Sequence, residues 1–97
     1  MSARQIREEV FVADHHPVLQ QRVAYVLPIV PDGAPYAVAE GIARRRLAAM
    51  TGRCPCGASV DYGDRKARQV MVGNVVHTAS CPASDARLVK AIRRWVR

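Results

Sequence analysis

Two short stretches decide how this 97-residue sequence is interpreted: Arg53-Cys-Pro-Cys-Gly57 and His77-Thr-Ala-Ser-Cys81. Together they contain every cysteine of the chain, and each offers two zinc-binding side chains close together in sequence. Residues 57–76 lie between the two pairs, which is enough chain for a β-hairpin that brings the pairs together. A structural zinc site needs four such ligands in a tetrahedral arrangement. The sequence therefore predicts one structural zinc ion bound by Cys54, Cys56, His77 and Cys81.

The neighbouring residues support a metal site. Gly57 lacks a Cβ where backbone amides must turn toward the thiolate sulfurs, and Pro82 is expected to begin a helix whose positive end stabilises the Cys81 thiolate. The alternatives are three buried thiols beside an ordinary core histidine, or a redox pair at Cys54 and Cys56. The regular pairing disfavours the first alternative, and the lack of a βαβ pattern disfavours the second. Four candidate ligands indicate a closed structural site, because a catalytic zinc ion keeps an open position.

The rest of the C-terminal half predicts a hairpin and a helix. β-Branched residues in 59–62 and 68–76 flank a turn at Gly63-Asp64, and Gly73-Asn74 is interpreted as a bulge or second turn. From Pro82 onward an apolar stripe recurs at helical spacing. It consists of Ala86, Leu88, Val89, Ile92, Trp95 and Val96.

This order, a two-ligand turn followed by a hairpin and then two ligands at a helix start, resembles the treble-clef group of zinc fingers. It is similar to the small zinc-binding proteins common in actinobacteria and their phages. The resemblance covers residues 53–97 and implies zinc and a compact fold, without a particular activity. The family's turn is Cys-Pro-x-Cys-Gly, whereas Cys54-Pro-Cys-Gly57 is one residue shorter.

Residues 1–52 are interpreted as helical, so the predicted fold class is α+β, with an N-terminal helical pair packed on a treble-clef-like zinc module. Residues 10–13 fit either a strand or a helix. Asp14-His-His-Pro17 is interpreted as the start of a first helix that ends at Pro28, and a second helix is expected from Tyr36 to Met50. Gly52 occupies the position where a helix end favours a left-handed residue. Residues 1–52 and 53–97 are expected to form one compact domain.

Two further clusters have competing interpretations. His15 and His16 could form a second metal site, but a helix cap explains them better because no other ligand pair accompanies them. Arg44, Arg45 and Arg46 could contact phosphate, but consecutive helical residues point about 100° apart. A solvated helix end is the simpler interpretation of these arginines.

The charge indicates the kind of partner. The net charge is +7, and thirteen of the fifteen basic residues are arginine, which favours nucleic acid, acidic protein faces or anionic lipid. On the last helix a positive stripe opposes the apolar one, and it can either follow backbone phosphates or simply be solvated. The stripe consists of Arg87, Lys90, Arg94 and Arg97. Nucleic-acid binding is therefore the leading prediction.

The alternative is a protein-interaction module, such as a phage-type effector that docks on a host protein through its helical half, residues 1–52. That alternative expects an exposed apolar patch around Tyr36, Val38 or Ile42.

Other function classes find no support in the sequence. It shows no nucleophile elbow, phosphate loop, HExxH pair or carboxylate dyad, so we expect no enzymatic activity and no small-molecule substrate. The apolar run Val23–Val30 contains Pro28 and is too short to cross a bilayer. The charged N-terminus leads into no apolar segment, so we expect a cytoplasmic protein without a membrane partner. A reducing compartment agrees with cysteines that bind metal.

Overall fold

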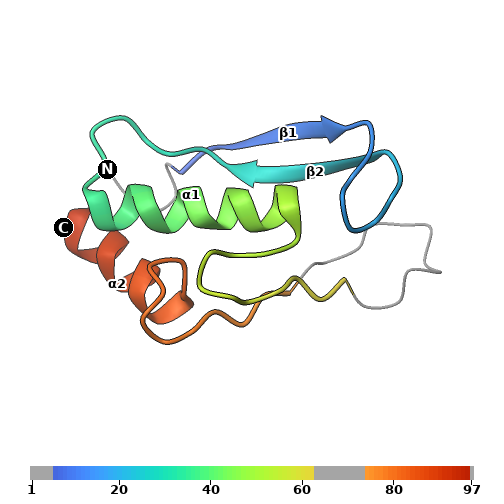
Figure 1. Cartoon of the computed structure of the whole chain (residues 1–97). Helices are drawn as coiled ribbons and strands as arrows, with labels where there is room; N and C mark the ends of the chain where they lie inside the picture. The colour runs from blue at the N-terminus through green and yellow to red at the C-terminus, as the bar shows by residue number, and fades with distance from the viewer. Residues whose placement is uncertain (1–5, 63–73, 97) are drawn as a thin grey trace.

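In the part of the chain that the structure describes, an antiparallel hairpin is followed by two helices. The computed structural model describes residues 6–62 and 74–96. Figure 1 shows α1 lying between the hairpin on one side and the C-terminal segment that carries α2 on the other. The elements are β1 (Glu8–Ala13), β2 (Val23–Pro28), α1 (Tyr36–Thr51) and α2 (Asp85–Trp95).

The predicted N-terminal helical pair is wrong, because the strands come first and the helices follow. Its supposed first helix is divided between a turn and β2. In β2 Val23, Tyr25 and Leu27 are at least partly buried, whereas Ala24 and Val26 are exposed. This alternation has the period of a strand, and the apolar residues that we interpreted at helical spacing satisfy it equally well. The uncertain stretch at residues 10–13 is part of strand β1.

Cross-strand pairing explains why the hairpin is preferred. Phe11 pairs with Tyr25, and their ring centroids lie 5.6 Å apart. Val10 pairs with Val26 on the opposite face of the sheet. Aromatic and β-branched pairs of this kind stabilise adjacent strands by about 0.2–1 kcal/mol each. A helix over the same residues would lose them.

His16 organises the turn between the strands, where we had expected a helix cap. The Nδ1 atom of His16 accepts hydrogen bonds from the backbone N–H groups of Val18 and Leu19, both at 3.2 Å. Its backbone carbonyl accepts a bond from the N–H of Gln20 at 2.8 Å. His16 is 1% exposed, and its Nε2 atom donates to the carbonyl of Ala49 at 2.9 Å. His16 therefore fastens the turn to the end of α1.

Helix α1 occupies the stretch where the second helix was predicted. It follows Pro35, whose fixed φ suits a helix start, and it ends at Gly52 with φ 83°. The N–H of Gly52 donates to the carbonyl of Ala48 at 2.7 Å. The left-handed helix end predicted at Gly52 is confirmed.

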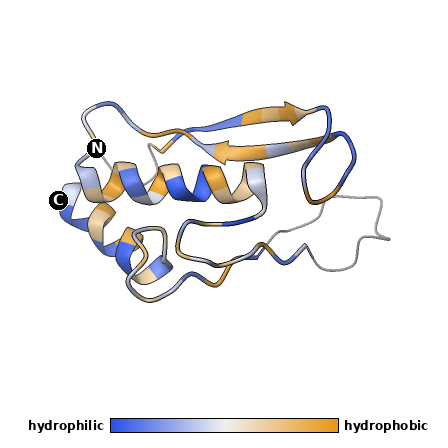
Figure 2. Cartoon of the chain, viewed as in Figure 1, coloured by the Kyte–Doolittle hydropathy of each residue, from blue (hydrophilic) through white to orange (hydrophobic). Residues whose placement is uncertain are grey.

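Within the described residues, buried apolar side chains form two clusters, both of which include residues of α1. Val38 and Ile42 pack against Leu88 of α2, and Ala48 packs beside Cys54 and other residues of the C-terminal segment. Figure 2 shows the alternation of hydrophobic and hydrophilic residues along α1 that these contacts require. Of the three residues around which the protein-docking alternative expected an exposed patch, Tyr36 is 79% exposed, whereas Val38 and Ile42 are buried.

Helix α2 begins later than predicted. Ser84 is its N-cap, with extended backbone and a side chain that accepts from the N–H of Arg87. Pro82 instead lies in a turn, closed by the N–H of Ser84 donating to the carbonyl of Cys81 at 3.0 Å. The positive end of α2 is therefore not directly next to Cys81.

The hairpin predicted over residues 59–76 lies mostly outside the described residues, because residues 63–73, which include Gly63-Asp64 and Gly73, are not among them. Within the described part, Asp61 and Asn74 form an antiparallel bridge, as Arg53 and Ser59 also do.

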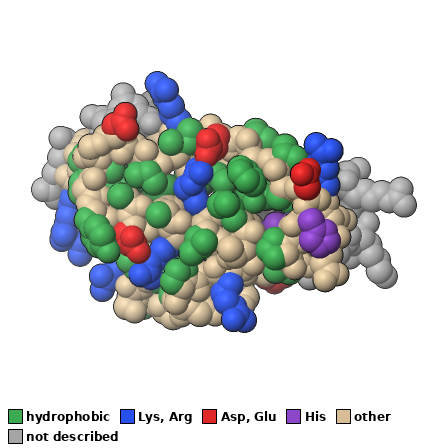
Figure 3. Space-filling view, turned by 45° about the horizontal axis from the view of Figure 1, so that its top comes forward, with side chains coloured by type: hydrophobic (Ala, Val, Ile, Leu, Met, Phe, Trp, Pro, Cys, Tyr) green, Lys and Arg blue, Asp and Glu red, His purple; other side chains and the backbone are tan. Residues whose placement is uncertain are grey.

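The outer face of the hairpin is apolar and exposed. Val10 is 69% exposed, Val26 56% and Val12 49%. In Figure 3, hydrophobic side chains gather on the side of the molecule that carries the hairpin, with single charged side chains between them. Among the described residues, no helix has the length and apolar character needed to cross a membrane.

Candidate metal centre

A tight loop after α1 presents the first two predicted ligands. The N–H of Cys54 donates to the carbonyl of Ala58 at 2.8 Å, and the N–H of Gly57 donates to the carbonyl of Cys54 at 2.9 Å. Gly57 has φ 98°, a conformation that side-chain-bearing residues rarely adopt. The glycine therefore allows the chain to reverse between Cys54 and Ala58, which places both cysteines on the same side of the loop.

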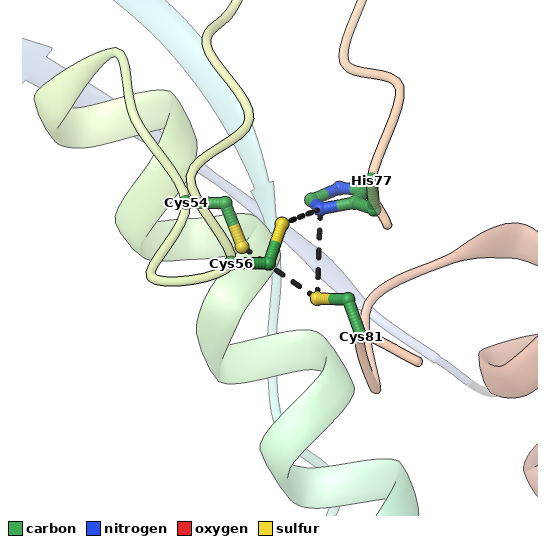
Figure 4. Close-up of side chains that lie close together, drawn as sticks. All are labelled: Cys54, Cys56, His77 and Cys81. Carbon is green, nitrogen blue, oxygen red and sulfur yellow. Dashed lines mark hydrogen bonds between the residues drawn. The ribbon is translucent and has the colours of Figure 1, made fainter. Parts of the chain in front are cut away.

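A second turn presents the other two predicted ligands. The N–H of Cys81 donates to the carbonyl of Thr78 at 3.0 Å, which places Cys81 one turn after His77. Cys81 is buried, while His77 is half-buried. Figure 4 shows the four labelled side chains converging from these two turns beside α1.

The structure brings the four predicted residues into one cluster. Their donor atoms all lie within 4.8 Å of one another. The Sγ atoms of Cys54 and Cys81 are 3.7 Å apart, and His77 Nδ1 lies 3.7 Å from the Sγ atoms of both Cys56 and Cys81. A tetrahedral ion with Zn–S bonds of about 2.3 Å and Zn–N bonds of about 2.0 Å requires S–S distances of about 3.8 Å and S–N distances of about 3.5 Å. The cluster can therefore hold a single metal ion.

The two cysteines of the first loop have opposite electrostatic environments. Hydrogen bonds from the backbone N–H groups of Thr78 and Ala58 lower the pKa of Cys56 to about 5. Burial raises the pKa of Cys54 to about 11. In this geometry Cys56 therefore loses its proton more readily than Cys54 does.

The three consecutive arginines of α1 have functions that sequence reasoning missed. Arg46 donates to the carbonyl of Pro28 at 2.8 Å and pairs with Glu9. Arg45 donates to the carbonyl of Ala83 at 3.0 Å and pairs with Asp85. Arg44 approaches Cys81, with 3.8 Å between Nη1 and Sγ. They point in different directions, as predicted, but Arg46 contacts the hairpin and Arg44 and Arg45 contact the C-terminal segment, so they do not form a merely solvated helix end.

The two adjacent histidines also differ from each other. His15 is exposed, and His16 is buried in the hairpin turn. Among the described residues, the only group of three or more potential ligands that the structure brings together is the one formed by Cys54, Cys56, His77 and Cys81.

The predicted nucleic-acid residues lie on α2. Arg87, Lys90 and Arg94 are exposed, and Arg97 lies outside the described residues. Arg93 adds a further exposed positive charge on the same helix. The one acidic residue of α2, Asp85, pairs with Arg45, with 2.7 Å between Oδ1 and Nη2. The described part of the α2 surface is therefore predominantly basic.

Comparisons with known protein families, with curated proteins and with solved structures found no match. The function is therefore argued from the donor geometry and from the surface.

Proposed function

We propose that this chain is a non-enzymatic zinc-binding protein that presents the basic face of α2 to nucleic acid. Cys54, Cys56, His77 and Cys81 hold one structural zinc ion, and the ion joins the loop after α1 to the segment that precedes α2. The observation that carries the proposal is the convergence of the four donor atoms within 4.8 Å.

The chemistry of the donors favours zinc and a structural role. Three thiolates and an imidazole in a tetrahedral arrangement suit Zn²⁺ better than magnesium, calcium or manganese, which prefer oxygen ligands. Four protein ligands complete the coordination of the ion, so no position is left for a catalytic water molecule. The reducing cytoplasm is the compartment in which these cysteines would stay available as ligands.

Elemental analysis of the purified protein tests the metal centre. We expect about one zinc ion per chain, and replacing His77 with alanine should reduce the zinc content, since a three-ligand site binds zinc more weakly. Replacing the exposed His15 with alanine provides the control and should leave the zinc content unchanged. A folded wild-type protein without bound metal would show that the proposed function is wrong.

The basic face of α2 supports nucleic acid as the partner. Arg87, Lys90 and Arg94 are exposed, so they can neutralise backbone phosphates and release counterions. The affinity for duplex DNA should then fall steeply with salt, with a slope of about −0.9 per phosphate contacted on a log–log plot. A contribution from phosphates alone implies little sequence preference.

A charge-reversal experiment distinguishes DNA binding by this face of α2 from non-specific attraction of DNA to the net positive charge of the protein. Replacing Lys90 and Arg94 with glutamate should weaken binding to all DNA sequences alike and flatten the salt dependence. Reversing Arg7 and Arg22 changes the net charge equally at the exposed surface of the hairpin, and it should have a much smaller effect. Equal losses in both double variants, or no binding at moderate salt, would argue against nucleic acid.

The exposed apolar face of the hairpin favours a second candidate function, binding of a protein partner. Val10, Val12 and Val26 are exposed side by side on paired strands, and such patches often mark interaction sites. A photo-crosslinking residue at position 26 should then give a defined protein adduct. Unlabelled wild-type protein should compete for the partner and reduce the adduct, whereas the variant with Val10 and Val12 replaced by glutamate should not. If a crosslinking residue gives an adduct at position 90 on α2 but none at position 26, this function is contradicted.

A further inference from the structure

We propose that Arg44 is an outer-sphere partner of the metal centre, which donates a hydrogen bond from Nη1 to the Cys81 thiolate and thereby slows loss of the ion. This inference rests on the proposed zinc centre. It assigns a function at that centre to a residue that is not one of the four ligands. Arg44 lies on α1, far in sequence from Cys81, and its Nη1 atom is 3.8 Å from the Cys81 sulfur.

Glu40 orients this guanidinium group. Arg44 Nε donates to Glu40 Oε1 at 2.9 Å, one helical turn away, and both side chains are less than one-third exposed. A guanidinium group is planar and carries its N–H donors in a fixed fork. When Glu40 holds the Nε side of the fork, the orientation of the remaining donors is restricted, and Nη1 is directed at the sulfur.

The effect of Arg44 on the site is that of a directed donor. A Zn²⁺ ion with three thiolates and a neutral imidazole has a net charge of −1, so its sulfurs are strong hydrogen-bond acceptors. Because the carboxylate of Glu40 balances the positive charge of Arg44, the main interaction of Arg44 with Cys81 is the hydrogen bond from Nη1 to the sulfur. A hydrogen bond to a coordinated sulfur reduces the electron density available for protonation, which is the first step by which a thiolate leaves the metal.

The neighbouring arginines show that this contact is specific to one position. Arg45 and Arg46 also reach away from α1, but their partners are the oxygen atoms of carbonyl and carboxylate groups. Of these three arginines, Arg44 contacts a sulfur. Arg45 is therefore a matched control, because its loss also removes a contact between α1 and the C-terminal segment without touching a ligand.

The test compares zinc retention in the full-length R44Q and R45Q variants, measured by competition with a chromophoric chelator. We expect R44Q to bind zinc about 10- to 100-fold more weakly than the wild type, the range typical for loss of an outer-sphere partner. R45Q should keep nearly wild-type affinity, even if it lowers the melting temperature. In the cobalt-substituted proteins, the thiolate-to-metal charge-transfer band should shift in R44Q and stay in place in R45Q.

Two further variants keep the proposal testable if R44Q does not fold. R44K retains the positive charge but lacks the fork, so it should restore only part of the zinc affinity. E40Q should weaken zinc binding less than R44Q does, because it loosens the donor without removing it. Equal zinc affinity and an unchanged cobalt spectrum in wild type, R44Q, R45Q and E40Q would overturn this inference while leaving the zinc centre intact. Absence of metal from the wild type would overturn both.

Discussion

At the scale of single residues, the metal centre shows how different two neighbouring cysteines can be. Cys56 receives backbone hydrogen bonds that lower its pKa to about 5, whereas burial raises the pKa of Cys54 to about 11. Zinc binds thiolates, so a ligand that is still protonated must release its proton when the metal binds. The two positions therefore contribute differently to the pH dependence of zinc binding.

This difference predicts how many protons zinc binding releases at pH 7. Where the loop keeps its folded geometry before the metal binds, Cys54, with its raised pKa, is protonated at this pH and gives up its proton to the buffer, whereas Cys56 has already lost its own. The C54S variant should accordingly release about one proton fewer than the wild type, and C56S about the same number. Titration calorimetry in buffers of different ionisation enthalpy measures this number. Equal reductions in both variants would contradict the assignment.

His16 carries a second prediction at this scale. Its ring accepts two backbone hydrogen bonds and donates one to Ala49, and the side chain is buried. H16A should lower the free energy of unfolding by about 2–4 kcal/mol, because it opens a cavity and leaves buried polar groups without partners. Denaturant unfolding measures this loss, and zinc content should stay at the wild-type level. H15A is the matched control, and a similar loss of stability in H15A would argue against the role of His16.

The residues of the metal cluster could be predicted from the sequence because the two ligands of each pair are close together along the chain. The functions of His16 and Arg44 could not, because their partners Ala49 and Cys81 are distant in sequence. A histidine before a proline fits a helix cap by local rules, and only the folded chain shows that its ring is buried against α1. Local patterns thus identified the cluster but not the contacts that support it.

At the scale of elements, the helices were easier to predict than the strands. Helix α1 extends over four turns between two local boundary residues, Pro35 and Gly52, whereas β1 and β2 are short. Val23, Val26 and Leu27 fit a helical face, but Val23, Tyr25 and Leu27 fit one face of a strand equally well. The decision between the two depends on the pairing of Phe11 with Tyr25 across the hairpin, which is a tertiary contact. The helical pair was wrong for this reason.

The close approach of α1 to the turn before α2 gives a prediction about packing. A Cβ atom on Gly41 would lie 2.5 Å from the carbonyl oxygen of Pro82 and 2.8 Å from Leu88. Alanine normally favours a helix by about 1 kcal/mol over glycine, but here the backbone of the turn would have to move. We expect G41A to be destabilising by about 1–3 kcal/mol, as for other overpacked cores. Thermal unfolding of the zinc-loaded protein measures the sign, and a stabilised variant would contradict this packing.

At the scale of the whole molecule, α1 connects the parts. It contributes Val38 and Ile42 to one core cluster and Ala48 to the other. Its arginines contact the hairpin through Arg46 and the C-terminal segment through Arg44 and Arg45. All four donors of the metal cluster come from residues after α1. The contacts that join the hairpin to α1 therefore do not include the metal ligands, although Ala48 and Arg44 of α1 contact the cluster on the other side.

This division predicts the order in which the molecule opens when zinc is removed. The described stretches 53–62 and 74–84 are joined through the metal cluster, and structural zinc contributes about 10–16 kcal/mol to folding in small zinc-binding peptides. After chelation, hydrogen exchange should accelerate first in these two stretches, while β1, β2 and α1 retain protection from packing around Leu27 and from the contacts of His16. Helix α2 should show intermediate protection, because Leu88 remains packed against α1. Hydrogen exchange followed by mass spectrometry, with and without chelator, resolves these segments. Simultaneous loss of protection in the hairpin and in residues 74–84 would mean that the metal stabilises the whole chain as one cooperative unit.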